Sequence, residues 1–530
     1  MNSFCIIPKL LISKIQSQIL KVLSKYLTSL ILGRMRIIRQ VFLLLIFTTF
    51  CISANSQIAV LNIGTATADI TPALPVALAG QFELRIAHSV ESSLTANVIA
   101  LESQDSYHSI DMAIMISCDV VSLPEEFLKM VRDEVHEQIP GIDVRKIFMT
   151  ATHTHTAPVL KNDLKESFRY QIPEEGVLQV TEYRAFFVKR VTEAIAKAWK
   201  NRRPGSVTWG LSHAAVGYNR RTVYSDATAQ MYGGTNTPKF MNIEGMEDHD
   251  VNILFFWGKS GKLIATTINV CCPAQEVENR SAVNADYWHP VRQQLKKRFG
   301  PDLCVLGWIG AAGDISPRPM YRKAAEDRMV KLRNLTQLEE IGRRIVLAVE
   351  EAYETVKDDR YSNVKFIHTV ETLALPMRLV TEAEYAFSKA EMKKAEEQIA
   401  VDPKSADVVL ARMTWNREVV IRYEKQKANP NPLLETEIHV LRLGDVAICT
   451  NEFELFTDFG VRIQARSNAL QTFVIQLAAG ARGYLATENA IKGGGYSAVI
   501  QTNMVGPQGG QNLVDQTVNL INNMFIEERR

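Results

Sequence analysis

The sequence is poor in cysteine, and the few cysteines it has do not suggest a disulfide framework. Seven of the 530 residues are Cys, and two of these, Cys5 and Cys51, lie in the first 56 residues. The other five are Cys118, Cys271, Cys272, Cys304 and Cys449. An odd number of cysteines in mostly apolar segments argues against a disulfide-stapled protein and predicts buried thiols, with Cys272 as an exception.

Beyond its first 56 residues, the chain has no excess of basic over acidic side chains. Residues 1–56 carry seven basic side chains and no acidic one, and removing those seven leaves 53 basic against 58 acidic residues. A chain with this charge has no electrostatic attraction toward a phosphate backbone. A nucleic-acid-binding function is therefore excluded as a first hypothesis.

A run of apolar residues long enough to cross a membrane, about 20 residues, is also missing. The apolar run near the start covers only residues 41–47, after Arg36 and Arg39, and is followed by the triplet Ala-Asn-Ser at 54–56. A basic start, a short apolar centre and a small-x-small site are typical of a cleaved secretory signal. We therefore interpret residues 35–56 as a secretory signal peptide.

This interpretation divides the chain into three parts. Residues 1–34 are an upstream extension or reflect a misassigned start, and residues 57–530 are the mature protein. We expect the mature protein to be exported, to the periplasm or to the outside, without a transmembrane segment. The sequence leaves its oligomeric state open.

Apolar strand-like segments alternate with amphipathic segments along the mature chain. Strands are predicted at residues 110–118, 144–151, 251–257, 263–271, 303–309 and 438–449, and helices at 125–138, 181–201, 287–299, 328–356 and 455–469. The glycine-rich stretch 493–510 is expected to be a loop. The pattern predicts an α/β fold (a mixed α+β arrangement is also compatible), with one large catalytic domain of layered sheets flanked by helices.

Two charged helices are predicted at residues 382–400 and 406–427, on either side of Pro403. Their density of Lys, Glu and Arg predicts an exposed helical hairpin at 382–427. We expect this hairpin to be a solvated accessory element of the catalytic domain.

Two histidines follow the strand predicted at 144–151. His153 and His155 are spaced i and i+2, so in extended chain both side chains point the same way and can reach one centre. Neutral imidazoles are common zinc ligands. The alternative is a polar loop with two solvated histidines.

Three further polar segments lie after predicted strands or among glycines. Residues 310–317 are a small-residue turn that presents Ser316, without the G-x-S-x-G elbow of α/β-hydrolases, and an ordinary turn is the alternative. The acidic residues of 451–456 either bind a metal or cap the next helix. Tyr484 and Tyr496 either present phenols to a site or pack on the surface.

Taken in order, these segments resemble the catalytic domain of the neutral (alkaline, non-lysosomal) ceramidases. The resemblance runs from about residue 63 to residue 505. The matching residues are Gly64 with Asp69-Ile70-Thr71-Pro72, Thr152-His153-Thr154-His155-Thr156, Asn219-Arg220, Gly313-Asp314-Ile315-Ser316-Pro317, Tyr484 and Tyr496.

The resemblance implies a zinc-dependent hydrolase of an N-acyl amide and assigns roles to individual residues. It implies zinc ligation by His153, by Tyr484 and by Glu454, with Glu452 as the alternative glutamate. It also implies an essential Ser316, which attacks directly or orients a water molecule, and contacts with the reacting group from His155, Arg220 and Tyr496. Asp286 is either a partner of the site or a helix cap.

The sequence departs from the family pattern at two places. Cys272 precedes a proline where the family has a histidine, and we expect its thiolate to bind zinc while Cys271 faces away. We also expect the chain to be a shorter relative without the carboxyl-terminal immunoglobulin-like domain of the ceramidases, and to act on an acyl substrate other than ceramide. The alternatives are a zinc-dependent esterase or deacylase acting on an acylated sugar or lipid ester, and a non-catalytic binding protein on the same scaffold.

Overall fold

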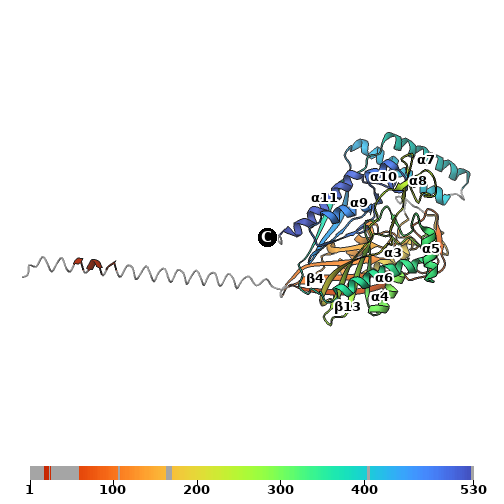
Figure 1. Ribbon diagram of the computed structural model, residues 1–530. Coiled ribbons are helices and arrows are strands. Elements are labelled where there is room, and N and C mark those ends of the chain that lie inside the picture. The colour runs from red at the N-terminus through yellow and green to blue at the C-terminus, as the bar shows by residue number, and fades with distance from the viewer. Residues whose placement is uncertain are drawn as a thin grey trace, which may run out of the picture. The chain divides into compact units, whose positions relative to one another are not determined.

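The computed structural model describes residues 59–105, 108–162, 170–402 and 406–526, together with some helical residues between 17 and 25 (Figure 1). Ala59–Arg530 form one compact unit and Met1–Ile58 another. The predicted signal peptide at 35–56 lies outside the described residues. Within the described ranges, no helix combines the length and the apolar character that a membrane span requires.

Two mixed β-sheets form the centre of the larger unit. The eight-stranded sheet has the order β14-β13-β12-β7-β1-β4-β5-β6, and the four-stranded sheet has the order β16-β17-β18-β20. The pairs β5–β6, β13–β14 and β18–β20 are parallel, and the other pairs within these two sheets are antiparallel. The bounds in the first sheet are β1 (Val60–Asp69), β4 (Thr95–Gln104), β5 (Ser109–Cys118), β6 (Ile147–Ala151), β7 (Arg203–His213), β12 (Asp250–Gly258), β13 (Leu263–Val270) and β14 (Cys304–Ile309). Those in the second are β16 (Phe366–Pro376), β17 (Leu433–Leu443), β18 (Val446–Thr450) and β20 (Gln471–Ile475).

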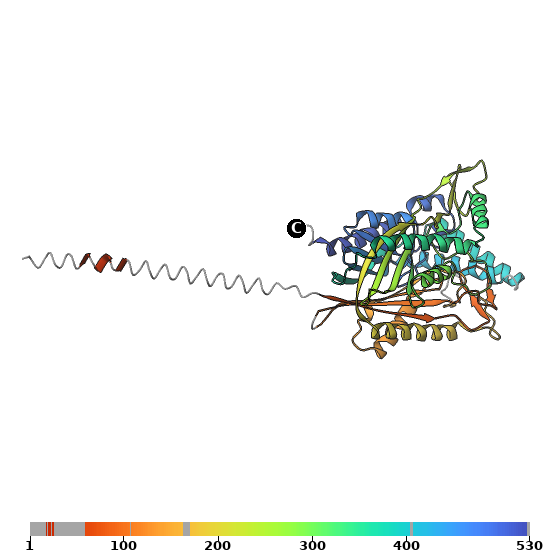
Figure 2. The same cartoon turned by 60° about the horizontal axis from the view of Figure 1, so that its bottom comes forward.

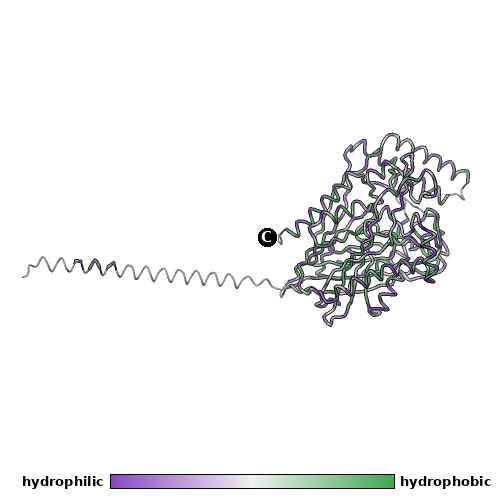
Figure 3. The backbone as a smooth tube through the Cα atoms, in the orientation of Figure 1, coloured by the Kyte–Doolittle hydropathy of each residue, from purple (hydrophilic) through white to green (hydrophobic). Residues whose placement is uncertain are grey.

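The alternation of side chains along each strand produces two separate cores. In β4, Ile99 and Leu101 belong to a cluster that also contains residues of both sheets, so this cluster fills the space between the sheets. Val98 and Ala100, which alternate with them along the strand, belong instead to the cluster packed against helices. Hydrophobic residues accordingly gather along the central strands (Figure 3).

Helices cover the outer faces of both sheets and complete four layers (Figure 2). The eight-stranded sheet is covered by α2 (Glu125–Gln138), α3 (Val180–Lys200), α4 (Trp288–Phe299) and α6 (Gln337–Val356). The four-stranded sheet is covered by α9 (Thr457–Arg466) and α11 (Pro507–Met524). This arrangement confirms the predicted α/β class with layered sheets flanked by helices.

Short elements gather where several of the central strands end. These elements are β2 (Val76–Leu78), β3 (Arg85–Ala87), β8 (Tyr218–Asn219), β9 (Arg221–Tyr224), β10 (Ala229–Met231), β11 (Phe240–Ile243), β15 (Ile315–Ser316), β19 (Glu454–Leu455), β21 (Tyr484–Leu485), α10 (Glu488–Gly493) and the 3-10 turns η1 (Val144–Lys146) and η3 (Tyr496–Ala498). The predicted hairpin is present as α7 (Glu382–Val401) and α8 (Ala406–Ala428).

Four predicted elements differ from the structure. The strand predicted at 144–151 begins with the 3-10 turn η1, and only Ile147–Ala151 form β6. The helix predicted at 328–356 is two helices, α5 (Lys323–Leu332) and α6, because Asn334 adopts a left-handed backbone conformation with φ of 54°. The strand predicted at 438–449 is a hairpin of β17 and β18, turned at Gly444, whose φ is 63°. The loop predicted at 493–510 is wrong at its end, because α11 begins at Pro507, a residue suited to a first helical turn.

Glu340 on α6 provides a pH-dependent contribution to stability. Its carboxylate accepts hydrogen bonds from Arg343 and Arg344 at 2.8 Å. The hydrogen bond from Arg343, opposed by burial and reinforced by Arg344, lowers the pKa of Glu340 from 4.5 to about 2. Because the pKa is lower in the folded state, this stabilisation is present above pH 4.5 and is lost as the pH falls toward 2.

We therefore expect Glu340→Gln to lower the thermal midpoint at pH 7 by roughly 2–4 °C or more. The difference from the unmodified protein should shrink as the pH falls below 4, as measured by circular dichroism. A difference that stays constant from pH 7 to pH 3 would contradict the lowered pKa.

Candidate functional site

A pocket of about 490 Å³ lies beside the ends of several central strands. Its wall is partly apolar and aromatic and partly polar. The apolar and aromatic lining residues include Phe82, Val121, Pro124, Pro158, Val159, Leu160, Tyr170, Tyr232, Leu477, Tyr484 and Tyr496. The polar ones include His153, His155, Arg220, Gln275, Glu278 and Glu454. Six of the eight residues predicted for the site therefore line one pocket.

The first histidine is held rigidly in the loop that follows β6. His153 has a φ of 61°, and its Nδ1 donates a hydrogen bond to the carbonyl oxygen of Val121 at 2.7 Å. A carbonyl oxygen only accepts, so the proton is on Nδ1 and Nε2 carries a lone pair. Thr154 and Thr156 hold the loop by donating from their hydroxyls to Asn284, both at 2.7 Å. The fixed loop directs the lone pair of His153 into the pocket.

Glu454 and Tyr484 are brought together by strand pairing. The short strands β19 and β21 are parallel, and Glu454 is the direct partner of Tyr484. The Glu454 carboxylate hydrogen-bonds the Tyr484 hydroxyl, and its Oε2 lies 3.7 Å from His153 Nε2. Burial, with the Glu454 charge, raises the pKa of Tyr484 well above its usual value.

The alternative glutamate, Glu452, has a different role. It is almost fully buried, its carboxylate pairs with Arg482 at 2.7 Å, and it accepts a hydrogen bond from the backbone N–H of Glu437 at 2.8 Å. The structure thus places Glu454, and not Glu452, with the histidines.

Arg220 lines the pocket and is almost fully buried. Its guanidinium donates to the Tyr484 and Tyr232 hydroxyls, each at 3.2 Å, and to the backbone oxygen of Gly313 at 2.9 Å. Burial lowers the pKa of Arg220, but the neighbouring phenols outweigh this and raise it, so the group stays charged. A fixed positive charge therefore faces the pocket.

The Gly-Asp-x-Ser-Pro segment supports Arg220 through Asp314. The Asp314 carboxylate accepts from the Asn219 amide at 2.8 Å and from the backbone N–H of Thr457, at the start of α9, at 2.9 Å. Its backbone oxygen accepts from the N–H of Arg220 at 2.9 Å. Gly313 is required beside it, because an added Cβ would lie 2.3 Å from the carbonyl oxygen of Glu454.

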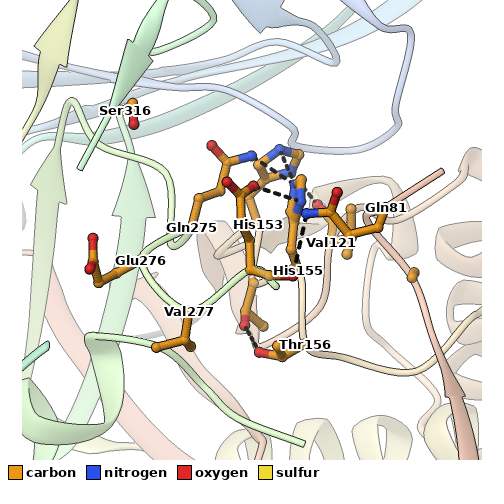
Figure 4. Close-up of polar contacts among 12 residues, drawn as sticks. Gln81, Val121, His153, His155, Thr156, Gln275, Glu276, Val277 and Ser316 are labelled. Atoms are coloured by element: carbon orange, nitrogen blue, oxygen red, sulfur yellow. Dashed lines mark hydrogen bonds and ion pairs between the residues drawn. The ribbon is translucent and has the colours of Figure 1, made fainter. Parts of the chain in front are cut away.

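Ser316 is not the exposed turn residue that the sequence predicts. Its side chain is fully buried in β15, and its hydroxyl accepts from the Tyr232 hydroxyl at 3.2 Å. Figure 4 shows it apart from the two histidine rings. Tyr232 lines the pocket, whereas Ser316 does not. Ser316 is therefore connected to the pocket through its hydrogen bond with Tyr232.

Cys272 does not join the other predicted ligands. Its fully buried sulfur lies 3.3 Å from the carbonyl oxygen of Val216, in the apolar cluster that packs β12 and β13 against α4 and α6. Alternation along a strand does not apply here, because β13 ends at Val270 and Cys272 lies in the turn after it. The residues that reach the pocket from the segment after this turn are Gln275 and Glu278.

Tyr496 is positioned by the helical hairpin. Its ring packs against Trp415 of α8, with ring centroids 5.5 Å apart, and against Phe82 at 5.8 Å. Val419 of α8 is fully buried, and Arg422 donates to the backbone oxygen of Ile500 at 2.9 Å. The hairpin is therefore more than a solvated accessory element, because it braces the loop that carries Tyr496.

Sequence reasoning missed four residues of this site: Gln275, Glu278, Tyr232 and Asp314. Gln275 and Glu278 come from an irregular turn that has no periodic signal, and Tyr232 has a φ of 56° beside β10. Asp314 belongs to the Gly-Asp-x-Ser-Pro segment, but the sequence pattern assigns a role only to the serine of that segment. The Asp286 carboxylate accepts from the backbone N–H of Val277 at 2.9 Å, in the turn of Gln275, and from the backbone N–H of Tyr287 at 2.7 Å, at the start of α4, so it joins the two segments.

The donor chemistry of the pocket fits a zinc ion. In the described ranges, no three His, Cys, Asp or Glu side chains are already spaced as metal ligands. His153 nevertheless presents a lone pair beside the Glu454 carboxylate and the Tyr484 phenol, a mixed nitrogen and oxygen set of the kind zinc accepts. The Nδ1 atom of His155 is buried without a hydrogen-bond partner.

Comparison with known proteins identifies the fold. No protein-family model and no curated protein sequence matches the chain. A neutral ceramidase from Pseudomonas aeruginosa matches with a TM-score of 0.62 and 15% identity, over 88% of this chain and 75% of that chain. A ceramidase complexed with C2 matches with a TM-score of 0.60 and 14% identity, over 88% and 76%. The chain thus has the fold of the ceramidases, as the resemblance in sequence implied.

The contact between Trp415 and Tyr496 leads to a prediction about the hairpin. Trp415→Ala removes the ring that fixes Tyr496, and we expect turnover to fall about 10- to 100-fold, the cost of misplacing a site group. Trp415→Phe should restore most of the rate. The control Phe387→Ala, at a position on α7 that is 58% exposed, should leave turnover unchanged. Full turnover in a folded Trp415→Ala variant would show that the hairpin does not act on Tyr496.

Proposed function

We propose that the protein is an exported, zinc-dependent hydrolase that cleaves an N-acyl amide bond in a small-molecule or lipid substrate. One observation carries the proposal: His153, Glu454 and Tyr484 converge beside Arg220 at a pocket in a fold shared with ceramidases. Export is supported by the signal-like segment at 35–56 of the sequence.

His153, Glu454 and Tyr484 would hold the zinc. A bound zinc ion would polarise a substrate carbonyl and lower the pKa of a water molecule to about 7. The chain's own contribution is to fix these three groups through the Val121 carbonyl and the β19–β21 pairing.

Arg220 and Tyr496 are suited to stabilise negative charge on the carbonyl oxygen of the substrate. The Arg220 guanidinium is held by four oxygen acceptors, so it needs no reorganisation when charge develops nearby. Tyr496 lines the same pocket, and burial, with the Glu454 charge, raises the pKa of its phenol. A neutral phenol is able to donate a hydrogen bond to an oxyanion.

Water, and not Ser316, is the nucleophile that the geometry favours. The Ser316 hydroxyl is fully buried behind Tyr232. An attacking serine needs a base within hydrogen-bond reach, whereas the partners of this hydroxyl are the Tyr232 hydroxyl and the backbone N–H of Arg318 at 3.1 Å. Ser316 instead helps to position Tyr232.

The pocket suits a substrate in which one acyl group is joined to a polar group. Val121, Val159, Leu160 and Leu477 give it an apolar wall, and Arg220, Gln275 and Glu278 a polar one. A pocket of about 490 Å³ lies within the range typical of sites for compact ligands. We therefore expect a substrate with a single short or medium acyl chain next to an amide.

The proposal is tested with a panel of substrates. N-acyl amines and N-acyl sphingosines of increasing chain length, matched O-acyl esters and acetylated sugars are incubated with purified protein, with and without chelator. We expect amide cleavage that is lost with chelator and restored by zinc. Faster ester or sugar deacetylation would assign the esterase alternative, and no turnover of any substrate would support a binding protein.

Replacing Ser316 distinguishes attack by the serine hydroxyl from attack by a water molecule. Ser316→Ala should lower kcat by about 10-fold or less, because it removes one hydrogen bond to Tyr232, whereas loss of a nucleophilic serine costs on the order of 10⁴-fold or more. Mass spectrometry of the unmodified protein during turnover should show no acyl-enzyme. A covalent adduct on Ser316 would overturn the assignment of water.

A further inference from the structure

Arg85 is a buried arginine at the start of β3, close to the pocket. Its exposed fraction is only 8%. The guanidinium donates hydrogen bonds to four backbone carbonyl oxygens, those of Ala79 at 2.6 Å, His155 at 2.7 Å, Glu278 at 2.5 Å and Arg280 at 2.9 Å. Burying a charged group is costly unless the group is hydrogen-bonded, and here the backbone supplies all four acceptors. Arg85 is therefore held in one place by the segments that it connects.

The four acceptors belong to three segments that are distant in sequence. Ala79 lies between β2 and β3 together with Phe82, and both line the pocket. His155 comes from the loop after β6 and Glu278 from the turn that follows β13, and both line it as well. Arg85 is not itself a lining residue. One buried guanidinium thus joins three walls of the pocket.

The β2–β3 hairpin packs directly against the His155 ring. The backbone N–H of Ala79 donates to the carbonyl oxygen of Ala157 at 2.9 Å. Gly80 has a φ of 100°, and a Cβ added to it would lie 2.6 Å from His155 Cγ. This close approach requires glycine. Because the ring and the hairpin are in contact, a shift of the hairpin would displace His155.

The turn after β13 has to keep a fixed distance from the same histidine. The Gln275 amide nitrogen lies 2.7 Å from His155 Nε2. Arg318, whose side chain is 33% exposed, holds the turn by donating to the Gln275 carbonyl oxygen at 3.2 Å and to the Glu278 carboxylate at 2.8 Å. Arg85 holds the same turn through its backbone and connects it to the loop of His155. The contact between Gln275 and His155 therefore depends on Arg85.

We propose that Arg85 is a positioning residue of this site. By fixing the hairpin, the histidine loop and the turn after β13 relative to one another, it keeps His155, Gln275 and Glu278 at the spacing that the reaction requires. The inference rests on the proposed function for the reaction itself. A guanidinium suits this task because its five N–H donors form a rigid planar fork, whereas the donors of a lysine ammonium share one nitrogen.

Hydrogen–deuterium exchange of the full chain tests these connections without a substrate. In Arg85→Ala, exchange should become faster by about tenfold or more at 79–85, at 153–159 and at 275–282, because a hydrogen bond from a charged donor stabilises a closed state by at least that factor. If Arg85→Ala does not fold, Arg85→Gln is measured in its place by the same criterion. A folded variant in which these three segments exchange as in the unmodified protein would overturn the inference.

Arg442 provides a matched control. It is 1% exposed, and its guanidinium donates to the backbone oxygens of Gly444 at 2.9 Å, in the turn between β17 and β18, and of Met524 at 2.5 Å, at the end of α11. Arg442→Ala therefore removes a similarly buried guanidinium whose backbone acceptors lie away from the pocket. We expect it to lower the thermal midpoint but to leave turnover and the exchange of the three pocket segments unchanged.

The effect on catalysis is measured with the substrate that the panel identifies. At a temperature where all variants are folded, Arg85→Ala should lower kcat about 10- to 100-fold, the cost of misplacing groups in a site. Methylguanidinium added to this variant should restore part of kcat, and Arg85→Lys should remain slow. Zinc affinity should stay that of the unmodified protein, because His153 and Glu454 are fixed by Val121 and by the β19–β21 pairing.

The outcomes separate this inference from the proposed function. Unchanged kcat in a folded Arg85→Ala variant, or a fall in kcat that Arg442→Ala matches, would overturn the inference while the proposed function stands. If the unmodified protein hydrolyses no acyl substrate, the proposed function fails, and the exchange of the three segments alone decides whether Arg85 fixes the pocket.

Discussion

Gln476 holds together the segments on which the site depends. Its backbone N–H donates to the carbonyl oxygen of Ile309, at the end of β14, at 3.0 Å. Its side-chain oxygen accepts from the backbone N–H groups of Ala312 at 2.9 Å and Leu455 at 3.1 Å. Each of these buried donors would cost about 1–3 kcal/mol if left without a partner. Gln476 therefore connects the end of β14 to the segments of Ala312 and Leu455.

Both sides of the pocket are connected to the hydrogen bonds of Gln476. Leu455 follows Glu454, whose strand pairing sets Tyr484, and Ala312 begins the turn in which Asp314 supports Arg220. The acidic and phenolic groups thus come from the four-stranded sheet's side and the histidines from β6 of the eight-stranded sheet. The Arg220 guanidinium lines the same pocket and donates to the Tyr484 hydroxyl, so the proposed site would have a fixed positive charge available to stabilise an oxyanion.

The sequence was informative where local pattern determines structure. The amphipathic pattern at 125–138 gave the bounds of α2, and the fold class follows from alternating strands and helices. The sequence was less informative where contacts between distant segments determine which residue enters the pocket. Glu452 and Glu454 are two residues apart, and only the pairing of β19 with β21 brings Glu454 into the pocket.

Irregular backbone explains the remaining differences between the sequence predictions and the structure. Cys272 lies beyond the end of β13, so the alternation of a strand does not decide which way its side chain points. Gln275 and Glu278, which line the pocket, come from a turn that no periodicity describes. Ser316 is buried because β15 pairs with β8 of the Asn219 segment, a long-range contact that a turn motif does not reveal. Site residues on such turns are found from their contacts.

The central proposal is that His153, Glu454 and Tyr484 hold one zinc ion, without a thiolate from Cys272. Zinc K-edge X-ray absorption of the zinc-loaded protein measures this ligand set directly. We expect a first shell of nitrogen and oxygen at about 2.0–2.1 Å, with the outer-shell scattering of an imidazole. A sulfur scatterer at about 2.3 Å, or a first shell without imidazole scattering, would contradict the account.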